Sequence, residues 1–359
     1  METKVNKNYF AGQPIYVGID CHKTSWKVCI LGEHYEHKTF SQNPDPELLV
    51  KYLKKNFPGG SYHAVYEAGF SGFDSCRKLL ELEVDCKVIH PADVPTNQKE
   101  RLQKTDKIDS RKLARALKNG ELKGINIPCL ELEADRSLVR QRFRIMKDLT
   151  RIKLRVKSLL MQHHINIPEH LAVQSRHWSK VYTTWLKSLT IEQESLKLAI
   201  DNYVRYGETI RKELYLVNRQ VRTLSQSERY KDNFELLLSV PGIGLTTAMM
   251  LLVQIGDINR FKSFDELCSY VGLVPSMYGS GDKMVVGKMV KRGRKMLKIM
   301  LIEAAWVSIR TDPVMMAKFA ELSRVMKKNK AIIRIAKKVL NRIRYILKNH
   351  QAYEIGVVV

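Results

Sequence analysis

Two aspartates, Asp106 and Asp109, stand in a stretch that is otherwise strongly basic, RLQKTDKIDSRKLARAL at residues 101–117. Because they are three residues apart, they share one face if the stretch is helical. One interpretation is structural: Asp106 is an N-cap, and Asp109 interacts with the helix dipole from the first turn. The other is a metal site, in which carboxylate oxygens bind Mg²⁺ beside cations that hold a phosphate backbone. The metal site requires further carboxylates from elsewhere in the chain.

Two such carboxylates end predicted strands. The run PIYVGID predicts a buried strand over residues 14–20 that ends at Asp20, and YHAVYE predicts one over 62–67 that ends at Glu67. Strands at 25–31, 35–40 and 86–90, helices at 46–56 and 73–83, and a helix from the KTDKID segment complete the predicted order β-β-β-α-β-α-β-α. Acids in these places are typical of a ribonuclease-H-like nuclease, where two divalent ions about 3.5–4 Å apart stabilise an in-line phosphoryl displacement.

The runs YVGIDCHK, VYEAGFSGF, HPADVP and QKTDKIDSRKLARALKNGEL resemble the N-terminal half of the DEDD insertion-sequence transposases, the serine-using recombinases described as bridge-RNA-guided. The resemblance implies a RuvC-like domain over residues 1–128, with Mg²⁺ or Mn²⁺ as cofactor. It matches the family's four metal-binding acids to Asp20, Glu67, Asp106 and Asp109. The cations of the same stretch are predicted to contact nucleic acid: Lys104, Lys107 and Arg111.

The net charge is +24 at pH 7, and the basic residues are spread along the whole chain. This charge is typical of a protein that binds a polyanion, most simply nucleic acid. We expect no membrane span, because the longest apolar candidate, residues 299–309, is short and includes Glu303. No export signal follows the first residues, and the cysteines form no CxxC pair or zinc spacing. We therefore expect a cytoplasmic protein with reduced thiols, and the resemblance implies a bacterial one that associates with the nucleoid when it acts.

Residues 129–233 are predicted to form two long antiparallel helices with a helical excursion between them. Each long helix has a seam, a stripe of apolar residues at heptad spacing. The sequence leaves open whether the two seams pack on each other or one of them pairs with another protomer. The seams are Ile145, Leu149, Ile152, Val156 and Leu159, then Ile210, Leu214, Val217, Val221 and Leu224. The outer face of the first helix has charges of one sign, which suit an RNA backbone, and is predicted to include Arg136, Arg140, Arg142, Arg144, Lys147, Arg151, Lys153, Arg155 and Lys157.

Residues 234–359 begin with FELLLSVPGIGLTTAMMLLV, the pattern of a helix-hairpin-helix. Its glycines, Gly242 and Gly244, would let the backbone approach a phosphate at which helix N-terminal amides point. A tight turn between two helices is the alternative. Amphipathic helices are predicted at 296–309 and 330–347, so the fold class is α/β plus α: a RuvC-like domain, a coiled-coil middle and a helical C-terminal domain.

Before those helices comes a predicted loop, VPSMYGSGDKMVVGKMVKRGRKMLKIM, in which Gly279-Ser280-Gly281 by itself predicts only a turn. The succession PGIG, GLVP, SG and KRG resembles the C-terminal domain of the same transposases, and this resemblance assigns the nucleophile to Ser280. The segment reads GSGD where many relatives have SGG, so Ser276 is the second candidate. Predicted DNA contacts are the cations of the stretch: Lys283, Lys288, Lys291, Arg292 and Arg294.

The resemblance implies a DNA recombinase of a mobile element, which cuts and rejoins DNA through a phosphoserine. It further implies double-stranded target and donor DNA, a noncoding guide RNA, and a homo-oligomer (a dimer, with a tetramer in synapsis) whose sites combine the acids of one protomer with the serine of another. Two rivals remain. A RuvC-like structure-selective nuclease would use water and leave Ser280 structural, and a non-catalytic scaffold would use the acids as caps and ion-pair partners.

Overall fold

The computed structural model describes residues 10–95, 106–172, 178–280, 283–290 and 292–356. The chain divides into two compact units, Met1–Ile127 and Pro128–Val359, and each is described by itself. This division falls beside the predicted boundary after residue 128. The further boundary predicted after residue 233 stays a prediction.

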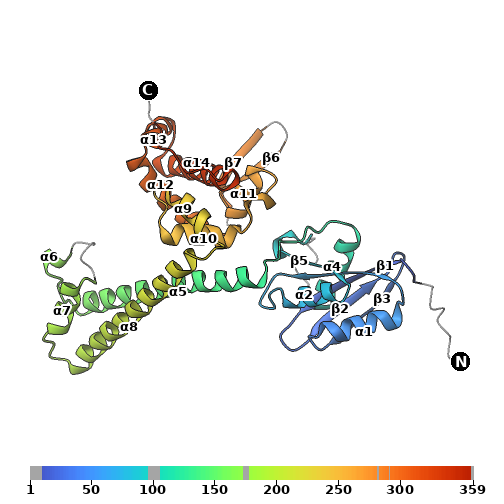
Figure 1. The fold of residues 1–359 in the computed structure, drawn as a ribbon. Coiled ribbons are helices and arrows are strands. Elements are labelled where there is room, and N and C mark those ends of the chain that lie inside the picture. The colour runs from blue at the N-terminus through green and yellow to red at the C-terminus, as the bar shows by residue number, and fades with distance from the viewer. Residues whose placement is uncertain (1–9, 96–105, 173–177, 281–282, 291, 357–359) are drawn as a thin grey trace. The chain divides into compact units, whose positions relative to one another are not determined.

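The first unit is built on a five-stranded sheet of order β3-β2-β1-β4-β5 (Figure 1). β1, β2 and β3, the three strands predicted to come first, form an antiparallel meander, and β4 and β5 run parallel to β1. With helices on both faces, this is the expected RNase H-like arrangement. The elements are β1 (Pro14–Cys21), β2 (Trp26–Leu31), β3 (Glu36–Gln42), α1 (Pro46–Asn56), β4 (Ser61–Glu67), α2 (Asp74–Glu81), β5 (Asp85–Ile89), η1 (Pro91–Asp93) and α4 (Asp106–Lys118).

Alternate residues of each strand face opposite layers. Ile15, Val17 and Ile19 of β1 belong to a core that also contains buried leucines of α1 and α2. Val65 of β4 belongs to a second core, with Leu113 of α4. The helices α1 and α2 therefore cover one face of the sheet, and α4 covers the other. Because side chains alternate along a strand, every second residue faces the same helix layer.

The second unit begins with two long helices. These are α5 (Leu130–Gln162) and α8 (Glu194–Ser225), with α6 (Glu169–Ala172) and α7 (Lys180–Ser188) between them. Two contacts give their relative direction. Arg142 Nε on α5 donates to Asn218 Oδ1 on α8 at 3.1 Å, and a Cβ at Gly207 of α8 would lie 3.4 Å from Ile152 of α5. Residue numbers along α8 therefore decrease as those along α5 increase. The helices are antiparallel, and their predicted seams enter shared cores within the chain.

Three residues of the predicted basic face turn inward: Arg140 donates to Gln254 Oε1 at 2.7 Å, Arg142 donates to Asn218 on α8, and Arg136 is buried. The side chain of Arg136 is buried, and its guanidinium donates to the carbonyl oxygens of Val253 at 2.6 Å and Gln254 at 3.2 Å. The prediction for Arg136 was wrong because the start of α5 is covered by another helix, α10 (Leu245–Ile255). There the arginine donates hydrogen bonds to carbonyl oxygens in the last turn of that helix. Those oxygens have no N–H donor within the helix itself.

Helix α10 packs against the long helices α5 and α8 as well as against the C-terminal helices, and its residues Ala248 to Ile255 are all buried. A helix that is apolar on all sides belongs at the centre of a domain. The elements are α9 (Lys231–Leu238), α10 (Leu245–Ile255), η3 (Ile258–Arg260), α11 (Phe264–Val271), β6 (Pro275–Ser280), β7 (Lys283–Met289), α12 (Lys295–Thr311), α13 (Pro313–Val325) and α14 (Lys328–Asn349).

This region is helical as predicted, with two differences. Much of the segment expected to be a loop forms an antiparallel strand pair, β6 with β7, in which Ser280 is paired with Lys283. The separate helix α13 was not predicted either. Asp312 begins it, because its carboxylate accepts from the backbone N–H groups of Val314 at 3.0 Å and Met315 at 3.2 Å.

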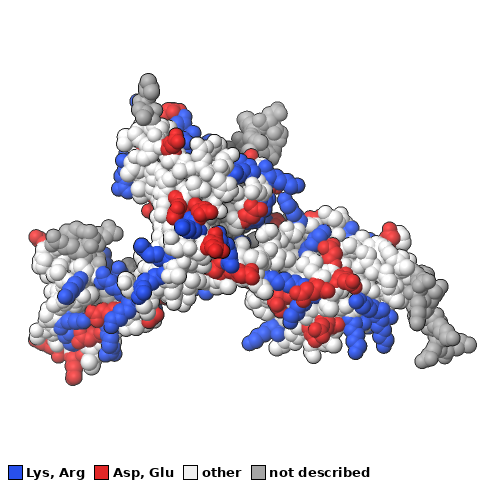
Figure 2. All heavy atoms as spheres, in the orientation of Figure 1, with Lys and Arg blue, Asp and Glu red and all other residues white. Residues whose placement is uncertain are grey.

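Among the described residues, no helix is both long enough and apolar enough to cross a membrane. On the face drawn in Figure 2, basic side chains are spread over both units, with acidic side chains among them. Basic side chains in that view are therefore not confined to one unit.

Candidate active site

Asp20 and Glu67 lie at the same edge of the sheet. β1 and β4 are parallel neighbours whose register pairs Ile19 with Tyr66, and each acid is the next residue along its strand. Asp20 is two residues from Gly18 and faces the same side of the sheet, toward α4. Glu67 is likewise two residues from Val65, which lies in the core beneath the same helix. Strand pairing and alternation together direct both carboxylates to the α4 face of the sheet.

Gly18 sets the height of α4 above β1. A Cβ atom there would lie 2.1 Å from the carbonyl oxygen of Ser110 and 2.5 Å from the backbone nitrogen of Ala114. Only a residue without a side chain permits this approach. The helix therefore crosses β1 two residues before Asp20, with Asp106 and Asp109 in its first turn.

The structure brings three metal-ligating groups together here. His22 Nε2 lies 3.2 Å from Asp20 Oδ2 and 3.3 Å from Asp106 Oδ2. One ligand atom from each of the three residues lies within 4.8 Å of the other two. The imidazole nitrogen of His22 lies between two carboxylate oxygens, where a positive charge is favoured. Carboxylate oxygens and an imidazole nitrogen are also common metal ligands, so these residues fit a divalent metal ion.

The acids influence one another electrically. Burial is the main cause that raises the pKa of Asp20; His22 lowers it, and the nearby charges of Asp106 and Asp109 raise it. Mutual repulsion among carboxylates that share a site is the condition that bound divalent cations relieve. Burial also raises the pKa of the neighbouring Cys21 thiol to about 12, so that thiol stays protonated at neutral pH.

Sequence reasoning missed His22. The signal was present, because His22 follows Asp20 by two residues and alternate residues of an extended chain share a face. Glu67 lies at the predicted strand end and is half-buried, with interactions of its own. Asp106 is the first described residue of α4, and its interpretation as an N-cap stays a prediction.

The predicted cations beside the acids have different environments. Arg111 forms an ion pair with Glu36 of β3, a contact within the first unit. Lys107 lies on α4, and Lys104 lies outside the described residues. The role of these side chains toward nucleic acid stays a prediction.

In the second unit, Ser280 is the last residue of β6 and is paired with Lys283, the first residue of β7. The base of this hairpin is closed by two glycines at positive φ: a Cβ at Gly293 would lie 2.6 Å from the Cα of Gly272. Close backbone contact therefore explains the glycines of the GLVP and KRG motifs. The hydroxyl of Ser276, the second candidate nucleophile, donates to the carbonyl oxygen of Lys288 at 2.9 Å.

Three of the predicted DNA-binding cations follow this hairpin. The guanidinium of Arg294 lies 5.2 Å from the centre of the Tyr270 ring, and its backbone N–H donates to the carbonyl oxygen of that residue at 3.0 Å. The Arg292 side chain is exposed, whereas Lys291 lies outside the described residues.

The two glycines of the PGIG turn differ. Gly242 has φ of 88°, and a Cβ there would lie 2.4 Å from the carbonyl oxygen of Ala304 on α12. Gly244 borders open space and precedes the first residue of α10. Packing against α12 accounts for Gly242, and Gly244 alone leaves room for a ligand to approach.

Comparison with known proteins agrees with this geometry. A family model described as "Transposase" and specific for the DEDD domain matches residues 17–165, and a model described as "Transposase IS116/IS110/IS902 family" matches residues 234–320. The chain is 26% identical over 303 residues to a transposase for insertion sequence element IS1533 of Leptospira borgpetersenii, covering 81% of this chain and 84% of that one. It is 23% identical to the IS1111A transposase of Coxiella burnetii, covering 65% and 62% of the two chains.

The RNase H-like sheet, its acids and these matches define a transposase, an enzyme acting on DNA, with a metal-dependent catalytic site in a DEDD domain. The chain belongs to the IS110/IS116/IS902 family of insertion-sequence transposases.

Proposed function

We propose that this transposase cuts and rejoins DNA through a phosphoserine intermediate formed by Ser280, with Mg²⁺ or Mn²⁺ held by Asp20, Glu67, Asp106 and Asp109. The observation that carries the proposal is that Asp20 and Asp106 converge with His22 where β1 ends, because one donor atom from each residue fits a divalent ion. Such an ion neutralises charge on phosphoryl oxygens and favours ionisation of a hydroxyl. His22 would hold Asp20 and Asp106 in position for it.

Ser280 is the better nucleophile candidate because the hydroxyl of Ser276 is already bonded to the backbone of β7. In the proposed step, the Ser280 oxygen forms a bond to phosphorus and the phosphorus–oxygen bond to one deoxyribose breaks. The serine proton leaves to a base and the released deoxyribose oxygen takes up a proton. The same number of ester bonds is kept, so reversal at a new strand end rejoins DNA without ATP. Arg292 and Arg294 would neutralise the phosphate.

The proposed nucleic acids are double-stranded target and donor DNA and a noncoding guide RNA. The net charge of +24 supports contacts to the backbone of both polymers, since a basic surface that is not confined to one patch can follow extended phosphates. The working state would be a homo-oligomer, a dimer or a tetramer. Its place would be the cytoplasm of a bacterium, on the nucleoid when it acts.

The decisive experiment incubates the full chain with Mg²⁺, element-encoded RNA and labelled matching DNA, and then runs a denaturing protein gel. We expect a covalent protein–DNA band for wild type and for Ser276→Ala, and none for Ser280→Ala. A band that disappears with Ser276→Ala instead would transfer the nucleophile to that residue.

The same reaction separates the two rival functions. A hydrolytic RuvC-like nuclease would release cut DNA with no covalent band and would tolerate Ser280→Ala. A binding scaffold would cut nothing and form no covalent band, and Asp20→Ala would leave its binding of nucleic acid intact.

A further inference from the structure

The segment that follows α14 is fixed against the C-terminal helices. His350 has a left-handed backbone, with φ of 51°, which turns the chain back after Asn349. The backbone N–H of Tyr353 then donates to Ser239 Oγ at 2.8 Å, and its hydroxyl donates to the buried carboxylate of Asp312. These two bonds hold the segment at a defined place beside the helix.

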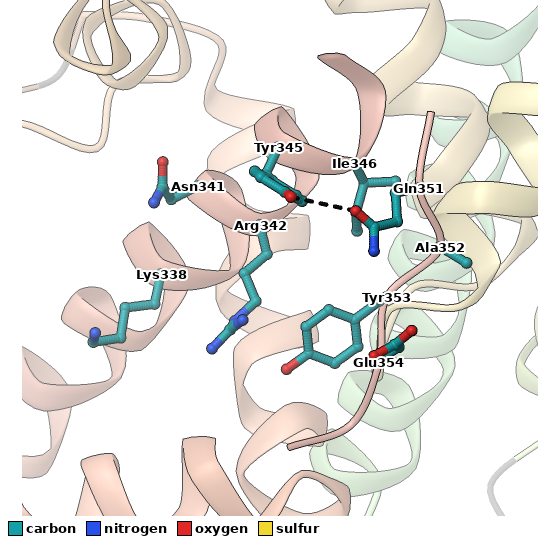
Figure 3. Close-up of a pocket in the computed structure, with 9 residues that line it drawn as sticks. All are labelled: Lys338, Asn341, Arg342, Tyr345, Ile346, Gln351, Ala352, Tyr353 and Glu354. Atoms are coloured by element: carbon teal, nitrogen blue, oxygen red, sulfur yellow. Dashed lines mark hydrogen bonds between the residues drawn. The ribbon is translucent and has the colours of Figure 1, made fainter. Parts of the chain in front are cut away.

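A cavity of about 440 Å³ lies between this segment and α14 (Figure 3). Its volume is within the range of small-molecule pockets, roughly 300–1,000 Å³. The lining combines two tyrosines, two cations and two amides: Lys338, Asn341, Arg342, Tyr345, Gln351 and Tyr353.

The cavity offers planar groups for stacking. The guanidinium carbon of Arg342 lies 5.1 Å from the centre of the Tyr353 ring, and Figure 3 shows both groups at the opening between helix and segment. Tyr345 is 58% exposed, although it is a large aromatic side chain, and its hydroxyl donates to Gln351 Oε1 at 3.3 Å. Exposed aromatic and guanidinium planes beside each other are the surfaces on which nucleic-acid bases stack.

The polar groups complete a nucleotide-like set of partners. The amides of Asn341 and Gln351 can each donate and accept hydrogen bonds at a base edge. Among the described residues, Lys338 and Arg342 form no ion pair with a carboxylate, and Glu354 is the acidic group of the lining, so the pocket has a positive balance. Cations without acidic partners are available to a phosphate.

We propose that this pocket binds one unpaired nucleotide of a single-stranded nucleic acid, with its base on Tyr345 and the Arg342–Tyr353 wall and its phosphate on Lys338. A paired base in a duplex has both faces covered by its neighbours and cannot stack on these side chains. The proposal goes beyond the recombination chemistry, because it uses neither the metal-ligating acids nor Ser280.

The test measures fluorescence anisotropy of labelled oligonucleotides of about six residues, a length within the usual site size of single-strand binders. The probes are oligo-dT, oligo-rU and a longer blunt DNA duplex, with full-length protein and EDTA so that no cleavage occurs. Tyr345→Ala should weaken single-strand binding about five- to a hundredfold, the effect of losing one stacked base. Tyr345→Phe should keep the affinity, and none of these variants should weaken duplex binding.

The matched control is Tyr215→Ala on α8, because Tyr215 is 65% exposed in the same unit and lies outside the pocket lining. A loss with oligo-dT alone would identify displaced DNA as the source, a loss with oligo-rU alone would identify RNA, and both would indicate indifference to the sugar. The proposal is overturned if wild type binds neither oligonucleotide, if Tyr345→Ala changes nothing, or if it weakens duplex binding equally. Failure of serine or metal chemistry would leave these results unchanged.

Discussion

At the scale of single residues, Asp20 is a position where burial and charge oppose ionisation. Burial raises its pKa, the charges of Asp106 and Asp109 raise it further, and His22 partly compensates. Ionising Asp20 therefore costs the folded protein free energy that it does not cost the unfolded chain. A bound divalent cation would remove this cost.

We accordingly expect Mg²⁺ or Mn²⁺ to raise the Tm of the protein and EDTA to reverse the change. A ligand at a hundred times its Kd stabilises the native state by about 2.7 kcal/mol. Differential scanning calorimetry should show the shift in wild type and its loss in Asp20→Ala and Asp106→Ala. Asp85→Ala, at the start of β5, is the control that keeps it. Equal shifts in all four proteins would place the ion elsewhere.

Tyr353 is expected to make the stability of the protein depend on pH. Burial first, and then its hydrogen bond to Asp312, raise the pKa of Tyr353 to about 12, above the ordinary value of about 10. The folded state thus favours the protonated phenol. Its contribution to stability is complete below about pH 10 and is lost as the pH rises through 12.

Tyr353→Phe should therefore lower the free energy of unfolding by about 1.5–3 kcal/mol at neutral pH, the range for a hydrogen bond to a charged group. Urea titrations at increasing pH should show this difference between wild type and variant shrinking above pH 10. A difference that stays constant up to pH 12 would contradict the assigned hydrogen bond.

At the scale of elements, the crossing of α4 over β1 depends on Gly18. The backbone of the helix occupies the space of a Cβ, and backbone cannot give way as a side-chain end can. Gly18→Ala should cost about 1–3 kcal/mol, as overpacking does, and should displace the turn that holds Asp106 and Asp109. Gly124→Ala is matched, because a Cβ there meets Lys87 at an ordinary 3.6 Å.

Hydrogen exchange followed by mass spectrometry should show faster exchange in β1 and α4 for Gly18→Ala than for Gly124→Ala. The thermal shift by metal should also be smaller in the first variant. Unchanged exchange in α4 would mean that the helix does not depend on this glycine for its position.

Elements with strong local signals could be predicted from the sequence. The apolar strands that end at Asp20 and Glu67 have clear composition, and the spacing of Asp106 and Asp109 states their common face whatever the neighbours are. His22 could have been predicted from the sequence as well, because it follows Asp20 by two residues and alternate residues of an extended chain share a face. The prediction of four acids at one edge thus rests on local patterns together with a family resemblance.

Features that depend on distant partners could not be predicted. β6 needs β7 across from it, and Gly279 and Ser280 by themselves favour a turn. Arg136 has the sequence context of a solvent-exposed helix face, and only the packing of α10 against α5 buries it. The nucleotide-sized pocket likewise exists because the chain after α14 returns to Ser239 and Asp312, which are far from it in sequence.

At the scale of the whole molecule, the acids proposed to bind metal belong to the first unit, and Ser280, the proposed nucleophile, belongs to the second. Neither unit alone therefore contains both the proposed nucleophile and the proposed metal site. A homo-oligomer can satisfy this requirement by pairing the first unit of one protomer with the second unit of its partner.

This arrangement predicts complementation between two inactive variants. Asp20→Ala and Ser280→Ala, mixed in equal amounts and allowed to exchange subunits, form heterodimers in which one composite site carries both defects and the other carries none. Random exchange puts half of the protein in heterodimers, so we expect roughly a quarter of the wild-type covalent product. Sites completed within one protomer would instead leave the mixture as inactive as its parts. Two different Ser280 substitutions mixed together are the control, because they leave every site without a nucleophile in either arrangement.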